Sequence, residues 1–319
     1  MGKKLKPLEI SVIIPIYNEE GNLAELHEKL SDVLASIAKS YEIVFIDDGS
    51  TDDSFRILKE INTEDRNVKV VRLRRNFGQS AALKAGFDYA KGDTIVTMDG
   101  DLQNQPEDIP SLLRKLDEGY DIVSGWRADR KDPFLTKKLP SKLSNWLASK
   151  ITGVKLHDFG CTLKAFRQEA VKNLDLYGEM HRYIPALASW RGVSIAELKV
   201  KHRPRQHGQS KYGIGRLIRG MLDLVTVKFL LSYSARPLQL FGLPGIISFF
   251  AGFIIGAYLA VEKFLFDTSL ADRPLLLLAV LLVFVGVQFI IMGLLGEMTA
   301  RMYYQVPGKF VYTVKEIIE

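Results

Sequence analysis

Short apolar runs alternate with amphipathic stretches through the first part of the chain. Runs rich in Val and Ile predict strands that are buried on both faces, at residues 10–16, 41–46, 68–73, 94–98 and 121–124. Between these runs, apolar residues recur at helical spacing, in segments 22–38, 54–61, 80–90 and 106–118. Strands that alternate with helices in this way predict an α/β domain built on an open sheet.

Two later runs, residues 237–261 and 274–296, contain no Asp, Glu, Lys or Arg. As a helix, each run is long enough to cross the ~30 Å hydrocarbon layer of a bilayer. Buried core helices are the alternative, but helices of globular proteins rarely stay uncharged over more than about twenty residues. We therefore predict two transmembrane helices within residues 234–298.

The segment 213–233 joins the first part of the chain to these spans. Arg216 and Arg219 fall on one face of the predicted helix, and apolar residues form most of the remainder. Such a helix is predicted to lie in the membrane interface, and packing between domains is the alternative. The predicted organisation is a soluble head at 1–212, this juxtamembrane helix, the two spans and a C-terminal tail at 299–319.

Charge and cysteine content indicate orientation and compartment. Basic residues concentrate before the first span, whereas the loop between the spans carries only Lys263 and Arg273. The positive-inside rule then predicts a cytoplasmic head with both termini on the same side. A net charge of +6 suits an anionic membrane surface, and we expect no nucleic-acid partner. The single cysteine, Cys161, excludes an intrachain disulfide and fits a reducing compartment.

Polar residues follow three of the predicted strands. Ligands of open α/β sheets bind beyond the carboxyl ends of the strands, so the three clusters are expected to line one cleft. In the last cluster, Asp99, Asp101 and Gln103 offer the oxygen ligands that Mg²⁺ or Mn²⁺ prefers. A single Asp-x-Asp is also common as an acidic turn. Its position directly after a buried strand is what favours a metal site.

The other two clusters are predicted to bind a nucleotide. Asp47 and Asp48 precede Gly49, which permits a tight turn, and their carboxylates can accept hydrogen bonds from a nucleobase or ribose. This loop could equally cap the helix that follows. After the first strand, Tyr17 offers an aromatic ring with polar neighbours. The predicted donor-binding residues are Pro15, Tyr17, Asn18, Glu19, Asp47, Asp48, Asp99 and Gly100.

In this order and spacing, the segments 15–19 (PIYNE), 47–50 (DDGS) and 99–103 (DGDLQ) resemble the family 2 glycosyltransferases of the GT-A fold. Segments 158–167 (DFGCTLKAFR) and 203–212 (RPRQHGQSKY) further resemble the polyprenyl-phosphate hexosyltransferases, which include dolichol-phosphate mannose synthases and bactoprenol glucosyltransferases. The resemblance covers nearly the whole chain. It implies a Rossmann-like catalytic domain that binds a nucleotide-sugar, a divalent metal at the DGDLQ segment, and a homo-oligomer.

The resemblance also implies roles for individual residues. Asp101, Asp158 and Arg127 are the expected catalytic residues, and Asp158 either orients acceptor-site cations or contacts the donor sugar. A basic site for the acceptor phosphate is implied at Arg130, Lys137, Lys138, Ser141, Arg205 and Lys211.

A polyprenyl phosphate acceptor would itself be the nucleophile. The second pKa of a phosphate monoester lies near ~6, so the acceptor is largely dianionic at neutral pH and needs no strong general base. Two anions that approach to ~4 Å repel by several kcal/mol at an effective dielectric constant near ~20, so cations must offset this repulsion. The metal is expected to stabilise the departing nucleoside diphosphate while the basic site holds the acceptor. We expect inverting transfer of a hexose.

Several alternatives remain at this point. The segment 233–242 resembles bacterial bactoprenol-phosphate glucosyltransferases, which favours UDP-glucose, undecaprenyl phosphate and the bacterial inner membrane. A GDP-mannose-dependent enzyme is the alternative donor assignment. A polysaccharide synthase would share the nucleotide and metal motifs, but no Gln-x-x-Arg-Trp follows the metal motif. An inactive membrane scaffold is the non-enzymatic alternative, which the intact DGDLQ segment disfavours.

Overall fold

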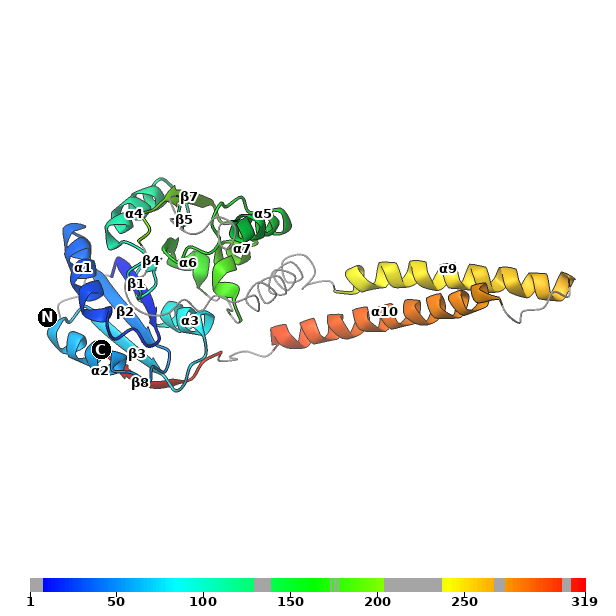
Figure 1. Ribbon diagram of the computed structural model, residues 1–319, viewed down its shortest axis with the longest axis horizontal. Coiled ribbons are helices and arrows are strands. Elements are labelled where there is room, and N and C mark those ends of the chain that lie inside the picture. The colour runs from blue at the N-terminus through cyan, green and yellow to red at the C-terminus, as the bar shows by residue number, and fades with distance from the viewer. Residues whose placement is uncertain are drawn as a thin grey trace. The chain divides into compact units, whose positions relative to one another are not determined.

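The computed structural model describes residues 8–128, 139–172, 174, 176, 178–203, 237–266, 273–305 and 311–319 (Figure 1). The chain divides into two compact units. One comprises Met1–Val227 together with Phe310–Glu319, and the other comprises Lys228–Lys309.

The first unit is an α/β domain. Its strands are β1 (Ile10–Ile16), β2 (Tyr41–Asp47), β3 (Val68–Leu73), β4 (Thr94–Thr97), β5 (Ile122–Trp126), β6 (Lys164–Arg167), β7 (Ile195–Lys199) and β8 (Val314–Ile318). Its helices are α1 (Leu23–Ser36), α2 (Ser54–Glu64), α3 (Gln79–Tyr89), α4 (Ile109–Asp117), α5 (Leu139–Thr152), α6 (Gln168–Val171) and α7 (Ile184–Ser189). Short 3-10 turns, η1 (Pro106–Asp108) and η3 (Met180–Tyr183), precede α4 and α7.

The strands form one mixed sheet in the order β7-β5-β6-β4-β1-β2-β3-β8. β4, β1, β2 and β3 run parallel, whereas β6 pairs antiparallel with both β4 and β5, and β8 pairs antiparallel with β3. Because β6 runs against its neighbours, the residues that precede β6 lie at the same edge of the sheet as the carboxyl ends of β4 and β5. The loop before β6 can therefore meet the loops that follow β4 and β5 at this edge.

Helices cover both faces of the sheet. Alternate residues of β1, including Val12 and Ile14, are fully buried in one core with α1, α2 and α4. On the opposite face, Ile13 packs so closely against α3 that a Cβ on Gly86 would lie 2.2 Å from the Ile13 Cγ2 atom. Burial on both faces is the reason that the strands read as continuous apolar runs in the sequence.

The second unit contains two long apolar helices, α9 (Pro237–Phe266) and α10 (Pro274–Gln305). Both are long and apolar enough to cross a membrane, and only 17% and 11% of their most apolar windows are buried. Core helices of soluble proteins are mostly buried, so this exposure favours membrane spans. The two helices pack through small residues, since a Cβ on Gly252 would lie 2.6 Å from the Ala279 carbonyl oxygen.

The predicted strands and helices of the head are confirmed with small shifts of their ends, for example β5 at Ile122–Trp126 instead of 121–124. The sequence pattern missed β6, β7 and β8. The segment 299–319, predicted as a tail, instead continues α10 to Gln305 and contributes β8 to the sheet. The predicted boundary at residue 212 and the predicted juxtamembrane helix at 213–233 lie outside the described residues.

Candidate active site

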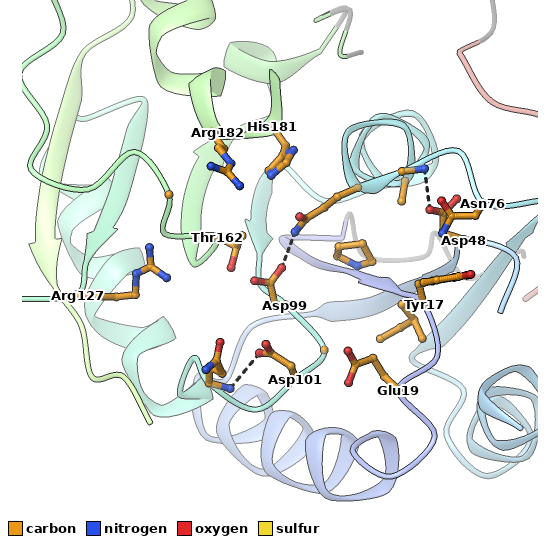
Figure 2. Close-up of a pocket in the computed structure, with 18 residues that line it drawn as sticks. Tyr17, Glu19, Asp48, Asn76, Asp99, Asp101, Arg127, Thr162, His181 and Arg182 are labelled. Carbon is orange, nitrogen blue, oxygen red and sulfur yellow. Dashed lines mark hydrogen bonds between the residues drawn. The ribbon is translucent and has the colours of Figure 1, made fainter. Parts of the chain in front are cut away.

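A pocket of about 320 Å³ lies at the edge of the sheet where β1, β2 and β4 end (Figure 2). The predicted site residues that line it are Pro15, Tyr17, Glu19, Asp48, Asp99, Gly100, Asp101, Gln103 and Arg127. Three polar clusters that are far apart in the sequence therefore share one pocket, as the strand-end argument predicts. Of the predicted acceptor-site residues, Ser141 lies half-buried on α5 and is not among the lining residues. Arg130, Lys137, Lys138, Arg205 and Lys211 lie outside the described residues.

The segment 99–103 forms the floor of the pocket. The Asp99 carboxylate accepts a hydrogen bond of 2.6 Å from the Gln79 side-chain amide, and the Asp101 carboxylate accepts one of 3.2 Å from the Gln103 backbone N–H. Leu102 adopts a φ of 59° and is nearly fully buried. A left-handed conformation is costly for a residue other than glycine, and such strain is typical of functional turns.

Gly100, between the two carboxylates, lies in close contact with the end of β1. A Cβ at this position would lie 2.4 Å from the Ile16 Cδ1 atom at the end of β1. The metal motif therefore packs directly onto the neighbouring strand, which fixes the two carboxylates relative to Tyr17 and its neighbours.

The electrostatics of this floor favour a cation. Burial and, second to it, the negative charge of Asp101 raise the pKa of Asp99 to about 6, although the Thr162 hydroxyl, Arg127 and Lys164 oppose the shift. Among the residues that the structure describes, no group of three or more His, Cys, Asp or Glu could hold a metal ion. The available set is two carboxylates and the Gln103 amide, which fits Mg²⁺ or Mn²⁺, since these ions take oxygen ligands and usually keep several waters.

One wall of the pocket is formed by the loops after β1, β2 and β3. The Asp48 carboxylate accepts hydrogen bonds from the backbone N–H groups of Phe77, at 2.7 Å, and Gly78, at 2.9 Å. Burial raises the pKa of Asp48 despite these two hydrogen bonds. Tyr17 and Asn76 flank Asp48 on this wall (Figure 2).

Two predicted nucleotide-binding residues, Asp47 and Asn18, form hydrogen bonds within the loops of this wall. Asp47 is fully buried, accepts a hydrogen bond of 2.9 Å from the Ser50 N–H and lies 3.2 Å from the Arg72 Nε. Asn18 accepts a hydrogen bond of 2.8 Å from the Thr51 N–H. Neither is among the residues that line the pocket in the described part of the chain, so their contact with a nucleotide stays a prediction.

The opposite wall carries Arg127, which follows β5. Its guanidinium binds the Asp158 carboxylate through two hydrogen bonds, Nε to Oδ2 at 2.7 Å and Nη2 to Oδ1 at 3.0 Å. Glu197 on β7 accepts hydrogen bonds from the backbone N–H groups of His157, at 2.9 Å, and Asp158, at 3.0 Å. The predicted catalytic residues Arg127 and Asp158 thus form one charge-assisted pair, and Asp158 lies behind the guanidinium.

Buried Lys164 supports the loop that connects Asp158 to β6. Its ammonium group donates hydrogen bonds to the backbone carbonyls of Cys161 and Phe159. Burial lowers the pKa of Lys164, while burial raises the pKa of the Cys161 thiol to about 11. Since the thiol holds its proton at neutral pH, Cys161 is a packing residue here and not a nucleophile.

Several lining residues were missed by the sequence patterns, namely Asn76, Gly78, Gln79, Thr162, His181 and Arg182. The loop after β3 could have been predicted, because β3 ends at the same edge as β2. Thr162 belongs to the DFGCTLKAFR segment, but its place beside Asp99 depends on the antiparallel direction of β6. No periodicity or motif distinguishes His181 and Arg182, which come from η3.

Comparison with known proteins identifies relatives over the whole chain. The sequence profile described as "Glycosyl transferase family 2" matches residues 11–175. The dodecaprenyl-phosphate galacturonate synthase of Rhizobium johnstonii is 42% identical, over 99% of this chain and 94% of the relative. An undecaprenyl-phosphate 4-deoxy-4-formamido-L-arabinose transferase of Klebsiella pneumoniae is 40% identical, over 97% of this chain and 94% of the relative.

Solved structures resemble the fold. Glucosyl-3-phosphoglycerate synthase from Mycobacterium tuberculosis, in complex with Mn²⁺, UDP and glucosyl-3-phosphoglycerate, superposes with a TM-score of 0.53 at 19% identity. The superposition covers 70% of this chain and 80% of that chain. At this identity the likeness supports the GT-A fold and carries no substrate assignment.

Proposed function

Because the chain belongs to glycosyl transferase family 2, we propose that it transfers a sugar from a nucleoside diphosphate-sugar to a polyprenyl phosphate. The observation that carries the proposal is the pocket itself. Asp99 and Asp101 lie at its centre, between the Tyr17 and Asp48 wall and the Arg127 wall (Figure 2). The two apolar helices and the two full-length relatives with polyprenyl-phosphate acceptors support a lipid acceptor.

Asp99, Asp101 and Gln103 are the residues that would hold a divalent metal. When bound, Mg²⁺ or Mn²⁺ would supply positive charge to the departing nucleoside diphosphate. The ion would also relieve the repulsion between the Asp99 and Asp101 carboxylates, which is second to burial in raising the pKa of Asp99. Tyr17, Glu19 and Asp48 would hold the nucleoside on the adjacent wall, with Asp48 fixed by its two backbone hydrogen bonds.

Arg127 and Asp158 would act on the acceptor side. The Asp158 carboxylate fixes the guanidinium in one orientation, so Arg127 can meet an anion in the pocket without first losing side-chain entropy. Of the two roles expected for Asp158, this pairing supports the orientation of a cation. The acceptor phosphate is largely dianionic at neutral pH, because its second pKa is near ~6, so the reaction needs no dedicated general base.

The donor sugar is the finer part of the proposal. The sequence resemblance favours UDP-glucose, whereas the two relatives named above transfer galacturonate and 4-deoxy-4-formamido-L-arabinose. A GDP-mannose donor is the remaining alternative. Orientation with the head in the cytoplasm rests on the positive-inside distribution, and homo-oligomerisation rests on the family resemblance.

The decisive experiment is a donor panel. Membranes that contain the protein would be incubated with undecaprenyl phosphate and radiolabelled UDP-glucose, UDP-galacturonate, UDP-4-deoxy-4-formamido-L-arabinose or GDP-mannose, with Mg²⁺ or Mn²⁺. We expect one label to enter a lipid-linked monosaccharide, and EDTA or Asp101→Ala to abolish the transfer. Label in long polymer without lipid-linked monosaccharide would favour a polysaccharide synthase. No transfer from any donor, with intact protein in the membrane, would favour the inactive scaffold.

A further inference from the structure

Two arginines line the pocket, and they differ in how closely each is paired with a carboxylate. Arg127 is bound through two hydrogen bonds by Asp158, and the side chain is only 14% exposed. Arg182 has a looser ion pair, 3.5 Å from its Nη2 atom to the Glu179 carboxylate, and its side chain is 30% exposed. An arginine has five N–H donors, so Arg182 retains donors that it can direct at a ligand in the pocket.

The segment that carries Arg182 is held in place by a buried contact with α3. The Ser80 hydroxyl, 1% exposed, accepts a hydrogen bond of 3.1 Å from the His181 N–H and lies 3.0 Å from the His181 Nδ1 atom. The residue before Ser80 is Gln79, whose amide donates to Asp99. One short stretch of chain thus fixes η3 and the metal motif relative to each other.

The distribution of charge in the pocket indicates the ligand. The lining carboxylates, Glu19, Asp48, Asp99 and Asp101, lie on the floor and on the wall with Tyr17. The Arg127 guanidinium lies on the other side of Asp99, and Arg182 and His181 lie above Asp99 in the same view (Figure 2). An anion that enters the pocket opposite the nucleoside wall therefore meets the guanidinium groups of Arg127 and Arg182. A phosphate group suits a guanidinium because its oxygens can accept two parallel hydrogen bonds.

We propose that Arg182 binds the phosphate of the acceptor lipid, beside Arg127, and that Ser80 is a positioning residue that holds η3 through His181. This inference rests on the proposed function and adds an acceptor-binding residue within the described part of the chain. It differs from the sequence-based acceptor site, whose basic residues lie before α5 and after β7.

The test separates the two substrates by steady-state kinetics. For Arg182→Gln, the KM for undecaprenyl phosphate in mixed micelles should rise about 10- to 100-fold, because a charge-assisted hydrogen bond is lost. The KM for the donor that is active in the panel should stay within about twofold of wild type. For Arg182→Lys, the KM for undecaprenyl phosphate should lie between the values of wild type and Arg182→Gln, since lysine keeps the charge and loses the planar fork. Arg191→Gln is the matched control, because Arg191 is exposed and donates to the Lys172 carbonyl outside the pocket.

Ser80→Ala tests the positioning role. It should raise the KM for undecaprenyl phosphate by less than Arg182→Gln does, while the KM for the donor stays unchanged. Ser189→Ala, which removes a hydroxyl bonded to the Ala186 carbonyl on α7, is the control.

Each outcome of these assays bears on the inference. A raised donor KM with an unchanged acceptor KM would assign Arg182 to the donor diphosphate and overturn the inference. Wild-type kinetics for Arg182→Gln would also overturn it while leaving the proposed function intact. The proposed function itself fails only if the wild-type protein forms no lipid-linked monosaccharide from any donor.

Discussion

Asp99 and Asp101 show how a buried pair of like charges prepares a site for a cation. The pKa of Asp99 is raised from 3.8 to about 6, by burial first and then by Asp101. A carboxyl with a higher pKa in the folded protein binds its proton more tightly when folded. Its contribution to stability is therefore complete at low pH and is lost as the pH rises through about 6.

We predict that metal-free protein loses stability, relative to Asp99→Asn, as the pH rises from about 4 to 7. The reason is that the buried Asp99 carboxyl of wild type must ionise over this range, whereas the amide in Asp99→Asn does not titrate. The measurement is thermal unfolding in detergent micelles with EDTA at several pH values. Curves that stay parallel for the two proteins would contradict the burial argument, and saturating Mn²⁺ should reduce the difference between them.

A second prediction concerns the pair of Arg127 and Asp158, whose side chains are 14% and 5% exposed. Asp158→Asn leaves the guanidinium without its carboxylate, which should cost about 3–5 kcal/mol of unfolding free energy and most of the transfer activity. The double variant Arg127→Gln with Asp158→Asn should cost less than the sum of the single variants.

The control for the Arg127 and Asp158 variants is Asp117→Asn. Asp117 is 53% exposed and pairs with Arg167 at 3.2 Å. A surface pair of this kind contributes about 0–1 kcal/mol, so its loss should be nearly neutral. Equal losses for the buried and the exposed variants would argue against a special role of the Asp158 pair.

At the level of elements, α9 and α10 pack because glycines let their backbones approach. A Cβ on Gly252 would lie 2.6 Å from the Ala279 carbonyl oxygen and 2.8 Å from the Val283 nitrogen, both backbone atoms that cannot rotate away. On the same helix, a Cβ on Gly256 would meet nothing within 4 Å. The two glycines offer a matched comparison of packed and open positions.

We expect Gly252→Leu to destabilise the helix pair by about 1–3 kcal/mol, because the larger side chain forces the helices apart. Gly256→Leu adds the same side chain at an open position and should leave stability nearly unchanged. The measurement is the melting temperature of detergent-solubilised protein, together with the yield of folded protein. A loss of similar size for both variants would mean that helix propensity, and not close packing, decides the effect.

At the level of the whole molecule, the chain leaves the catalytic unit, forms the two apolar helices and then returns to the sheet. β8 pairs antiparallel with β3 and covers what would otherwise be an exposed edge. The return is anchored by the Tyr312 hydroxyl, which donates a hydrogen bond of 2.9 Å to Asp88, and by Glu319, which forms ion pairs with Lys69 and Lys91.

Deletion of residues 311–319 should lower the melting temperature of the catalytic unit and promote aggregation, since the β3 edge loses its partner strand and Lys69 loses its carboxylate. Light scattering during thermal unfolding measures both effects. Glu316→Gln is the control, because its side chain is exposed on β8 and the strand remains. Unchanged stability after the deletion would show that the return strand is dispensable for the fold.

The sequence by itself determined the parallel half of the sheet, the two apolar helices and the central residues of the pocket. These features are local: a strand buried on both faces leaves a continuous apolar run, and polar residues directly after β1, β2 and β4 must lie at one edge. The likeness of PIYNE, DDGS and DGDLQ to one enzyme family then indicated the chemistry before any contact was known.

Only the tertiary structure decided the antiparallel half of the sheet and what it brings to the pocket. The direction of β6 carries Thr162 and Asp158 to the site, and the packing of η3 against Ser80 carries Arg182 there. β8 is five residues long and pairs with a strand more than 200 positions earlier. Such pairings depend on contacts between distant segments, which no local period of hydrophobic residues records.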